Sequence, residues 1–190
     1  MGTFPFILFG IKRDTFGGDL MLFLKIIIYI VLFTCCYLIG ALIAKKYANR
    51  VSELKDFRNA LNMFKTKIKF TYEPIPDIFK QICNSLDNSV GNVFKKASEN
   101  MKYKTAEYAW VKAIEEQENL NLTKEDIDVL KNLGKLLGKV DIEGQTRDIE
   151  LVESFLDTQI DKSEKEKATN EKLYKTLGIV CGFVLVIILI

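Results

Sequence analysis

The sequence predicts an all-α protein in which a cytoplasmic helical bundle is flanked by an N-terminal and a C-terminal transmembrane helix. Three observations support this fold class. Apolar residues concentrate toward the two ends of the 190-residue chain, the charged middle repeats its apolar residues at spacings of three and four, and no stretch keeps the strict alternation of a strand. The formal net charge is only +2, so the basic excess of a typical nucleic-acid-binding protein is absent and we expect no such partner.

Residues 1–20 show no sustained period. The run Gly17-Gly18-Asp19 stands just before a second methionine, Met21, and GGA GGT GAT, which encodes this run, is a strong bacterial ribosome-binding sequence. We therefore expect translation to start at Met21, which makes residues 1–20 a mis-called start. A genuine disordered tail is the alternative, and the intact mass of the native protein distinguishes the two.

The first predicted span occupies residues 21–44. Its only charge is Lys25, near the start, where the aliphatic stem can reach the membrane interface. About 20 apolar residues suffice to cross the hydrocarbon core as a helix. A cleaved signal peptide is the alternative, but the apolar stretch is long for one and residues 40–44 make a poor cleavage site.

The second predicted span occupies residues 173–190. Residues 177–190 are uninterrupted apolar sequence, which Leu173 and Tyr174 extend by a turn. The alternative is a buried helix of a soluble fold. Residues 184–190 have no polar face, however, and a domain this small offers little interior in which to bury them on all sides.

Basic residues border both spans on the side of the charged middle. They are Lys45, Lys46, Arg50, Lys172 and Lys175. Because Lys and Arg concentrate on the cytoplasmic side of a membrane, the middle is predicted to be cytoplasmic, in a cell-membrane protein with two spans. Membrane lipid is an expected partner, since each basic side chain near anionic headgroups contributes about 1 kcal/mol.

Residues 45–160 are predicted to form the helical bundle. Its first helix continues from the first span and ends at Pro74 and Pro76, which remove hydrogen-bond donors. The apolar stripe of this helix consists of Val51, Leu54, Phe57, Leu61, Phe64 and Ile68. Short helices are predicted at residues 77–86, 91–101 and 105–117, and small residues beside Trp110 indicate close packing on its ring.

Two more helices complete the predicted bundle. One begins at Thr123, a suitable N-cap, and ends at Gly138. The other begins with Asp141 as its cap and carries an apolar face that Phe155 broadens. That face consists of Ile149, Val152, Leu156 and Ile160. From residue 161 charges alternate and apolar residues almost vanish, which predicts a solvated helical stalk over residues 161–172 that enters the second span.

The residue types for catalysis are missing. The chain has no histidine, which removes the commonest general base and the commonest metal ligand. Residues 133–138 contain glycines without the spacing of a nucleotide-binding loop, and Cys35 and Cys36 lack the spacing of a metal site. We expect no enzymatic activity, no catalytic or metal-binding residue and no cofactor, but an anchored scaffold that binds other proteins.

From Met21 onwards the chain carries a series of segments with a distinctive order and spacing. They are Ala44-Lys45-Lys46-Tyr47, Phe57-Arg58-Asn59-Ala60-Leu61, Tyr72-Glu73-Pro74-Ile75-Pro76, Ala109-Trp110, Leu133-Gly134-Lys135-Leu136-Leu137-Gly138, Asp141 with Gln145, and the apolar C-terminal end. In this order the segments resemble the stage III sporulation protein AB family of endospore-forming bacteria.

The resemblance implies a function. Members of that family lie in the mother-cell membrane around the forespore, in a channel complex that joins the two cells, and their helical domain is similar to the F platform proteins of type II secretion. By resemblance, this chain docks the cytoplasmic secretion-type ATPase of the complex and couples it to the other membrane subunits.

The resemblance also suggests site residues. The candidate partner-binding residues are Arg58, Pro74, Asp141 and Gln145, for each of which a purely structural role is the alternative. Trp110, Gly134 and Gly138 are assigned to packing. Two other functions stay open at this point: a general membrane-anchored helical adaptor or regulator unrelated to a motor, and a small pore element whose spans offer only Thr34, Gly40, Gly178 and Gly182 as a lining.

Overall fold

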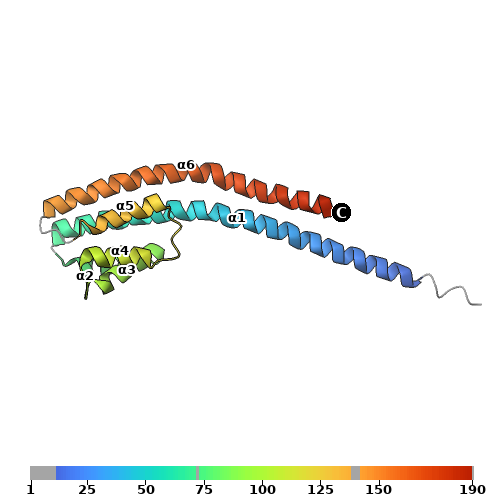
Figure 1. The fold of residues 1–190 in the computed structure, drawn as a ribbon, viewed down its shortest axis with the longest axis horizontal. Helices are drawn as coiled ribbons and strands as arrows, with labels where there is room; N and C mark the ends of the chain where they lie inside the picture. The colour runs from blue at the N-terminus through green and yellow to red at the C-terminus, as the bar shows by residue number, and fades with distance from the viewer. Residues whose placement is uncertain (1–11, 72, 138–141, 190) are drawn as a thin grey trace, which may run out of the picture. The chain divides into compact units, whose positions relative to one another are not determined.

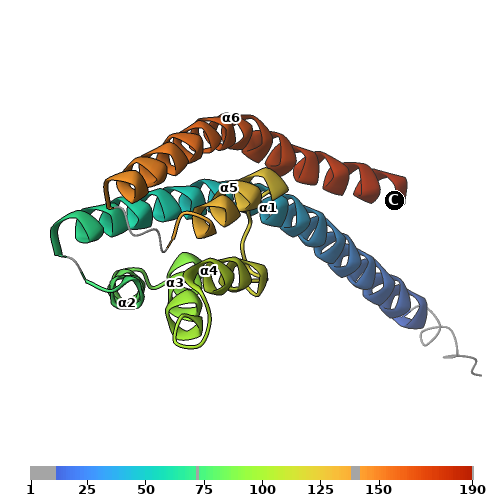
Figure 2. The same ribbon diagram turned by 60° about the vertical axis from the view of Figure 1, so that its left-hand side comes forward.

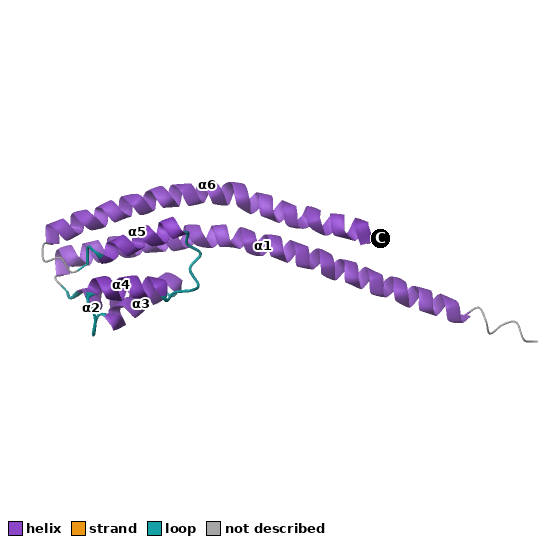
Figure 3. Ribbon diagram, viewed as in Figure 1, coloured by secondary structure: helices purple, strands orange, loops and turns teal. Residues whose placement is uncertain are grey.

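The computed structural model describes residues 12–71, 73–137 and 142–189, with side chains from Met21 onwards. These residues form α-helices and no strands (Figure 3), which confirms the predicted all-α class. They divide into two compact units. We call residues Ala44–Glu171 the helical unit, and we call the described residues up to Ile43 together with those from Lys172 onwards the span pair. Of residues 1–20, the structure describes only the backbone of residues 12–20, which is helical and belongs to α1; the start of translation at Met21 stays a prediction.

Helix α1 (Lys12–Thr71) runs without a break from the first predicted span into the helical unit (Figure 1). The sequence predicted this continuity. All six residues of the predicted stripe, from Val51 to Ile68, are buried. The helix ends at Thr71, just before the segment with Pro74 and Pro76, where the chain loses the donors that a continuing helix needs.

Four short helices follow: α2 (Ile75–Ser85), α3 (Ser89–Asn100), α4 (Ala106–Glu115) and α5 (Lys124–Gly134). Side-chain oxygens of Asn88, Thr105 and Thr123 cap α3, α4 and α5, each accepting a backbone N–H of the first turn. Helix α2 begins two residues earlier than predicted, with Pro76 in its first turn. Proline fits there because the first-turn N–H groups have no intrahelical acceptor.

The helical unit is layered. Helix α5 lies beside α1, helix α6 (Ile142–Leu189) covers one side of this pair, and α2, α3 and α4 cover the other side (Figures 1 and 2). The core between the layers is centred on Trp110, whose ring meets Phe79 and Phe94 edge-on with centroids 5.5 and 5.1 Å away. Its indole N–H donates to the Leu130 carbonyl at 2.7 Å, so the one polar atom of this buried ring is satisfied.

Helix α6 corrects the prediction in two places. Phe155 is 52% exposed and does not broaden the inner face, because the buried apolar side chains of α6 in the helical unit form the narrower stripe of Ile149, Val152, Leu156 and Ile160. The segment predicted as a solvated stalk continues α6 and belongs to the helical unit as far as Glu171. It also supplies a buried residue, Ser163, and acidic partners for α1.

The span pair consists of two helical segments long and apolar enough to cross a membrane. Glycines let their backbones approach closely: a Cβ on Gly40 would lie 3.2 Å from the Gly178 Cα, and one on Gly182 would lie 2.7 Å from the Phe33 ring. Phe33 also packs edge-on against Phe183, and the Tyr29 hydroxyl donates to the Leu189 carbonyl at 2.8 Å. The three glycines therefore serve helix packing between the spans.

Candidate functional site

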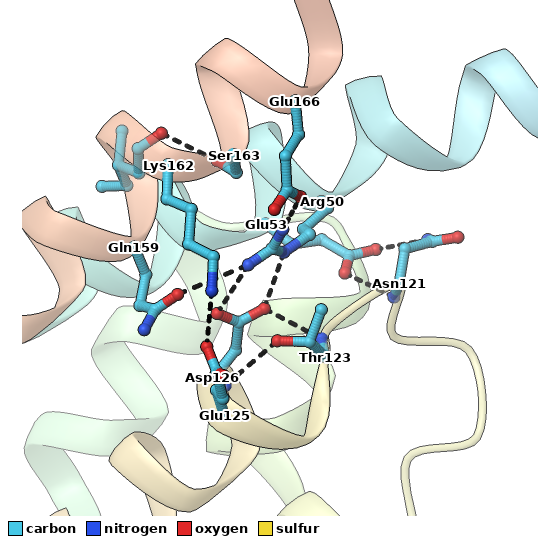
Figure 4. Close-up of polar contacts among 11 residues, drawn as sticks. Arg50, Glu53, Asn121, Thr123, Glu125, Asp126, Gln159, Lys162, Ser163 and Glu166 are labelled. Atoms are coloured by element: carbon cyan, nitrogen blue, oxygen red, sulfur yellow. Dashed lines mark hydrogen bonds and ion pairs between the residues drawn. The ribbon is translucent and has the colours of Figure 1, made fainter. Parts of the chain in front are cut away.

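A buried arginine–aspartate pair joins α1 to α5 within the helical unit (Figure 4). Arg50 Nε lies 2.8 Å from Asp126 Oδ2, and Arg50 Nη2 lies 3.1 Å from Asp126 Oδ1. The two side chains are 5% and 0% exposed. The planar guanidinium thus meets the carboxylate at two points, which is the strongest geometry for such a pair.

The N-terminal cap of α5 holds Asp126 in position. The backbone N–H of Thr123 donates to Asp126 Oδ2 at 2.8 Å, and the backbone N–H of Asp126 donates to Thr123 Oγ1 at 3.3 Å. This reciprocal arrangement is a capping box. Asp126 Oδ2 therefore serves the helix cap and the ion pair together, so the first turn of α5 is tied to α1.

Helix α6 closes the same cluster from a third side (Figure 4). Arg50 Nη1 donates to Glu166 Oε2, and Arg50 Nη2 donates to Gln159 Oε1 at 3.4 Å. Nearby, the Lys162 ammonium of α6 lies 2.8 Å from Glu125 Oε2 of α5. One side chain of α1 thus contacts both α5 and α6, and the three helices meet at Arg50.

The next turn of α1 fixes the segment that leads into α5. Glu53 Oε2 accepts the backbone N–H of Asn121 at 2.6 Å, and Glu53 Oε1 accepts the Asn121 side-chain amide at 2.8 Å. We refer to the whole arrangement as the Arg50 cluster. It comprises Arg50, Glu53, Asn121, Thr123, Glu125, Asp126, Gln159, Lys162 and Glu166.

The electrostatics of the cluster favour charged side chains. Burial alone would raise the pKa of Asp126, but hydrogen bonds from Arg50 and Thr123 outweigh it and hold that pKa below the usual aspartate value. The pKa of Arg50 is raised, chiefly by its hydrogen bond to Asp126. Glu53 behaves differently, because burial raises its pKa more than the hydrogen bonds from Asn121 lower it.

Further ion pairs join α1 to α6, and we call the three shortest among the described residues the α1–α6 ladder. They are Lys55 with Glu164 at 2.6 Å, Arg58 with Asp157 at 3.0 Å, and Lys65 with Glu153 at 2.5 Å. Residue numbers rise along α1 as they fall along α6, so the two helices are antiparallel here. Exposed pairs such as Arg58 with Asp157 contribute about 0–1 kcal/mol each, which makes the ladder a guide to register more than a source of stability.

The cluster is suited to holding helices in a defined arrangement. Apart from Glu53, which accepts hydrogen bonds from Asn121, its charged groups pair with one another. Within the described ranges no group of three or more His, Cys, Asp or Glu could hold a metal ion. Buried, mutually satisfied charges of this kind favour one specific arrangement, because any partial arrangement leaves a charge unpaired in a medium of low dielectric constant.

The predicted partner-binding residues that the structure describes belong to different elements. Arg58 lies on the partly exposed face of α1 and pairs with Asp157. Pro74 is exposed and precedes the first turn of α2. Gln145 corrects the prediction, because its side chain is only 4% exposed and cannot form part of an open surface. Asp141 lies outside the described residues. The three described members are not brought into one site.

Trp110 and Gly134, which were assigned to packing, are buried, whereas the lysines predicted to border the membrane are exposed. Trp110 is fully buried, and a Cβ on Gly134 would lie 3.2 Å from its ring; Gly138 lies outside the described residues. The lysines Lys45, Lys46, Lys172 and Lys175 are exposed. Arg50 corrects the expectation of a headgroup contact, because its guanidinium is buried and paired with Asp126.

The sequence reasoning missed Asp126 as a site residue and misjudged Arg50. A signal was available in both helices. Arg50 precedes Leu54 by four and Phe57 by seven, and Asp126 precedes Leu130 by four and Leu133 by seven. Both charges therefore stand on an apolar stripe at helical spacing, where a charged side chain requires a buried partner.

Comparisons with known proteins agree on one family. A family model described as stage III sporulation protein AB matches residues 25–190. A protein named stage III sporulation protein AB from Bacillus subtilis (strain 168) is 29% identical over 153 residues, which are 79% of this chain and 90% of that protein. A solved structure of a stage III sporulation protein AB has the same fold, with a TM-score of 0.61 at 24% identity, over 64% of this chain and 98% of the solved one.

Proposed function

Because this chain belongs to the stage III sporulation protein AB family, we propose that it is a platform subunit of the channel complex between mother cell and forespore. In this role it docks the cytoplasmic ATPase of the complex and couples that ATPase to the other membrane subunits, without being an enzyme itself. Family membership implies a sporulation role, and the two apolar helices fit a membrane protein. The mother-cell membrane is the proposed location.

The continuity of two helices is the observation that supports the proposal most. Helices α1 and α6 each extend from an apolar segment into the charged helical unit without a break. An α-helix transmits displacement along its axis because every backbone hydrogen bond lies nearly parallel to that axis. A partner that moves one of these helices in the helical unit therefore also moves the residues of the same helix in the membrane.

In this proposal, the Arg50 cluster couples the short helices α2 to α5 to the long helices α1 and α6. Helix α5 is bonded to α1 through Asp126 and to α6 through Glu125 and Lys162. Helices α4 and α5 also meet where Trp110 donates to the Leu130 carbonyl. Helix α3 in turn contacts α4 through the rings of Phe94 and Trp110, so a force that an ATPase applies to these short helices would reach α1 and α6 through this chain of contacts.

Two measurements test the proposal. The first is binding of the purified ATPase of the complex to the purified full chain, which we expect to be saturable and of defined stoichiometry. The second is the yield of heat-resistant spores in a strain that lacks this gene, which we expect to fall strongly and to recover with a copy that starts at Met21. Clean absence of binding contradicts the docking role. A normal spore yield contradicts the sporulation role and leaves a general membrane-anchored adaptor.

A further inference from the structure

A groove between α2 and α3 is lined by lysines without ionic partners among the described residues. The groove encloses about 390 Å³, and Lys80, Lys95 and Lys102 line it with their side chains exposed. Other lysines of the helical unit, such as Lys55 and Lys65, lie within 2.6 Å of a carboxylate oxygen. The groove therefore presents three cations whose charge is available to a binding partner.

The acidic residues of the groove shape what it can accept. Asp77 lies in the first turn of α2, where the N-terminal N–H groups of the helix compensate its charge. Glu99 also lines the groove. The lining is thus positive on balance but of mixed sign. A polyanion such as nucleic acid would meet repulsion at Glu99, whereas a peptide can place carboxylates on the lysines and an amide or a cation on Glu99.

The groove is held in shape by a bond across it. The Ser98 hydroxyl of α3 donates to the Pro76 carbonyl of α2 at 2.8 Å, and Ser98 is 9% exposed. This bond ties the first turn of α2 to the last turns of α3. A surface that is ordered before binding loses less conformational entropy when a partner arrives.

An exposed tyrosine adjoins the lysine rim. Tyr103 follows Lys102 directly and is 85% exposed, more than any other large apolar side chain among the described residues. Tyr108, on the next helix, is 49% exposed, with the Lys104 ammonium 5.7 Å from its ring centroid. Tyrosine is enriched at the centres of protein–protein interfaces, where it combines a large apolar ring with a hydroxyl.

We propose that this lysine groove, together with Tyr103, binds an acidic segment of the ATPase. Aspartate or glutamate side chains of the segment pair with Lys80, Lys95 and Lys102, and an apolar side chain beside them packs on the Tyr103 ring. This inference rests on the proposed function, which identifies the ATPase as the protein that binds this chain. It adds the docking surface and the chemistry of the segment that docks there.

The test uses the full chain in detergent and the purified ATPase. The groove variant is K80E/K95E/K102E, and the control variant K124E/K135E/K165E carries the same change in net charge at exposed lysines outside the groove. We expect the groove variant to bind the ATPase at least tenfold more weakly and the control variant to stay within threefold of the unaltered chain. Y103A should weaken binding about fivefold, and binding by the unaltered chain should weaken between 50 and 300 mM salt, as screening predicts.

The outcomes separate this inference from the proposed function. Unaltered affinity in the groove variant, confirmed as folded by circular dichroism, overturns the groove while leaving the docking role intact. Equal weakening in both triple variants also overturns it, because the attraction is then nonspecific. Binding of a poly(dT) oligonucleotide through the same lysines, without an effect on the ATPase, likewise overturns it. No binding to the unaltered chain overturns both the groove and the docking role.

Discussion

Arg50 and Asp126 are charged residues at positions where apolar side chains would satisfy the helical pattern. Replacing a buried ion pair by matched apolar residues is often neutral or stabilising, whereas removing one partner is strongly destabilising. The pair therefore contributes to specificity more than to stability, since the same Asp126 oxygen accepts hydrogen bonds from Arg50 of α1 and from the Thr123 backbone at the start of α5.

Removing the charge of Asp126 should destabilise the protein strongly. Asp126→Asn leaves the buried Arg50 without its two-point partner, and we expect a loss of about 3–5 kcal/mol in the free energy of unfolding. Thermal or urea unfolding of the full chain in detergent, followed by circular dichroism, measures it. The matched control is Asp157→Asn, which breaks the exposed pair with Arg58 and should cost less than about 1 kcal/mol. Equal effects of the two variants would contradict the role of the buried pair.

The lowered pKa of Asp126 predicts an acid limb in the stability curve. A carboxyl whose folded pKa lies below its unfolded value of about 3.9 contributes stability that is present above that value and is lost as pH falls through the folded pKa. Glu53 has the opposite effect on the pH dependence of stability. Burial raises its folded pKa, so its ionisation disfavours the folded state as pH rises. Unfolding midpoints between pH 7 and pH 2 should therefore fall less steeply in Asp126→Asn than in the unaltered chain. An identical acid limb in both proteins would exclude Asp126 as its source.

At the scale of single residues, contacts between neighbours in the chain could be predicted from the sequence, but contacts between distant residues could not. The cap at Thr123 was predictable because a cap uses neighbours in the chain. The partnership of Arg50 and Asp126 was not, because the pair spans 76 positions and many carboxylates compete for one arginine in a charged sequence. The helical spacing of Arg50 and Asp126 from apolar residues was a usable sign that both charges are buried, but only the tertiary structure identifies them as each other's partner.

At the scale of elements, the connection between α2 and α3 depends on one glycine. A Cβ on Gly91 would lie 1.9 Å from the Leu86 carbonyl oxygen, a backbone atom that cannot turn away. Gly91→Ala should therefore force the connection apart and destabilise the helical unit by about 3 kcal/mol. Asn92→Ala, at the exposed neighbouring position, is the control and should change stability by less than about 0.5 kcal/mol. The free energies of unfolding of the two variants and of the unaltered chain test this prediction, and equal values for the two variants would contradict it.

The close approach of the two spans is also testable. In a chain whose native cysteines are replaced by serine, F33C and F183C should be crosslinked by a short bismaleimide, because the two side chains face each other with ring centroids 5.1 Å apart. Adding Gly178→Leu should reduce this crosslink several-fold, since a Cβ there already lies 2.9 Å from the Cys36 carbonyl oxygen.

The readout of that experiment is retention of both fragments after cleavage at a protease site inserted after Asn119. The control is Val180→Leu, at a position 50% exposed on the same span. Equal crosslinking in the Gly178 and Val180 variants would show that the glycine contact does not set the distance between the spans.

Helices were predictable from the sequence where local signals define them. The starts of α4 and α5 follow Thr105 and Thr123, and the end of α1 precedes Pro74. The start of α2 was misplaced because proline is a helix breaker in the interior and a good residue in the first turn. Phe155 was misassigned because periodicity locates a stripe but not its width, which the neighbouring helices determine.

At the scale of the whole molecule, the helical unit should fold by itself. Residues Ala44–Glu171 form a compact unit with a continuous apolar core, which is the property of an independently folding domain. A fragment of residues 44–171 should be a soluble helical monomer that unfolds cooperatively. Size-exclusion chromatography with light scattering and a circular dichroism melt measure this. An aggregated fragment or one without a cooperative transition would contradict the division.

The overall plan was predictable because the hydrophobic contrast along the chain is strong. The long apolar run at residues 22–44, with Lys25 as its only charge, and the uninterrupted apolar run at residues 177–190 indicated the spans without any tertiary information. The extent of the helical unit was not predictable, because the alternating charges of residues 161–171 are equally compatible with a solvated stalk. The structure resolves that ambiguity by pairing Glu164 with Lys55 and Glu166 with Arg50.

The α1–α6 ladder also bears on how the chain is made. Its contacts, together with that of Arg50 and Glu166, join residues 88 to 116 positions apart, so α1 leaves the ribosome well before α6 exists. At bacterial elongation speeds this interval lasts roughly 5–20 seconds. Helices α2 to α5 can pack against their near neighbours during that time. The basic side chains of the ladder on α1, which are Lys55, Arg58 and Lys65, have no α6 to pair with until it is synthesised. Until α6 has been synthesised, any acidic amphipathic helix of another protein can compete for α1, and the arrival of α6 ends that competition.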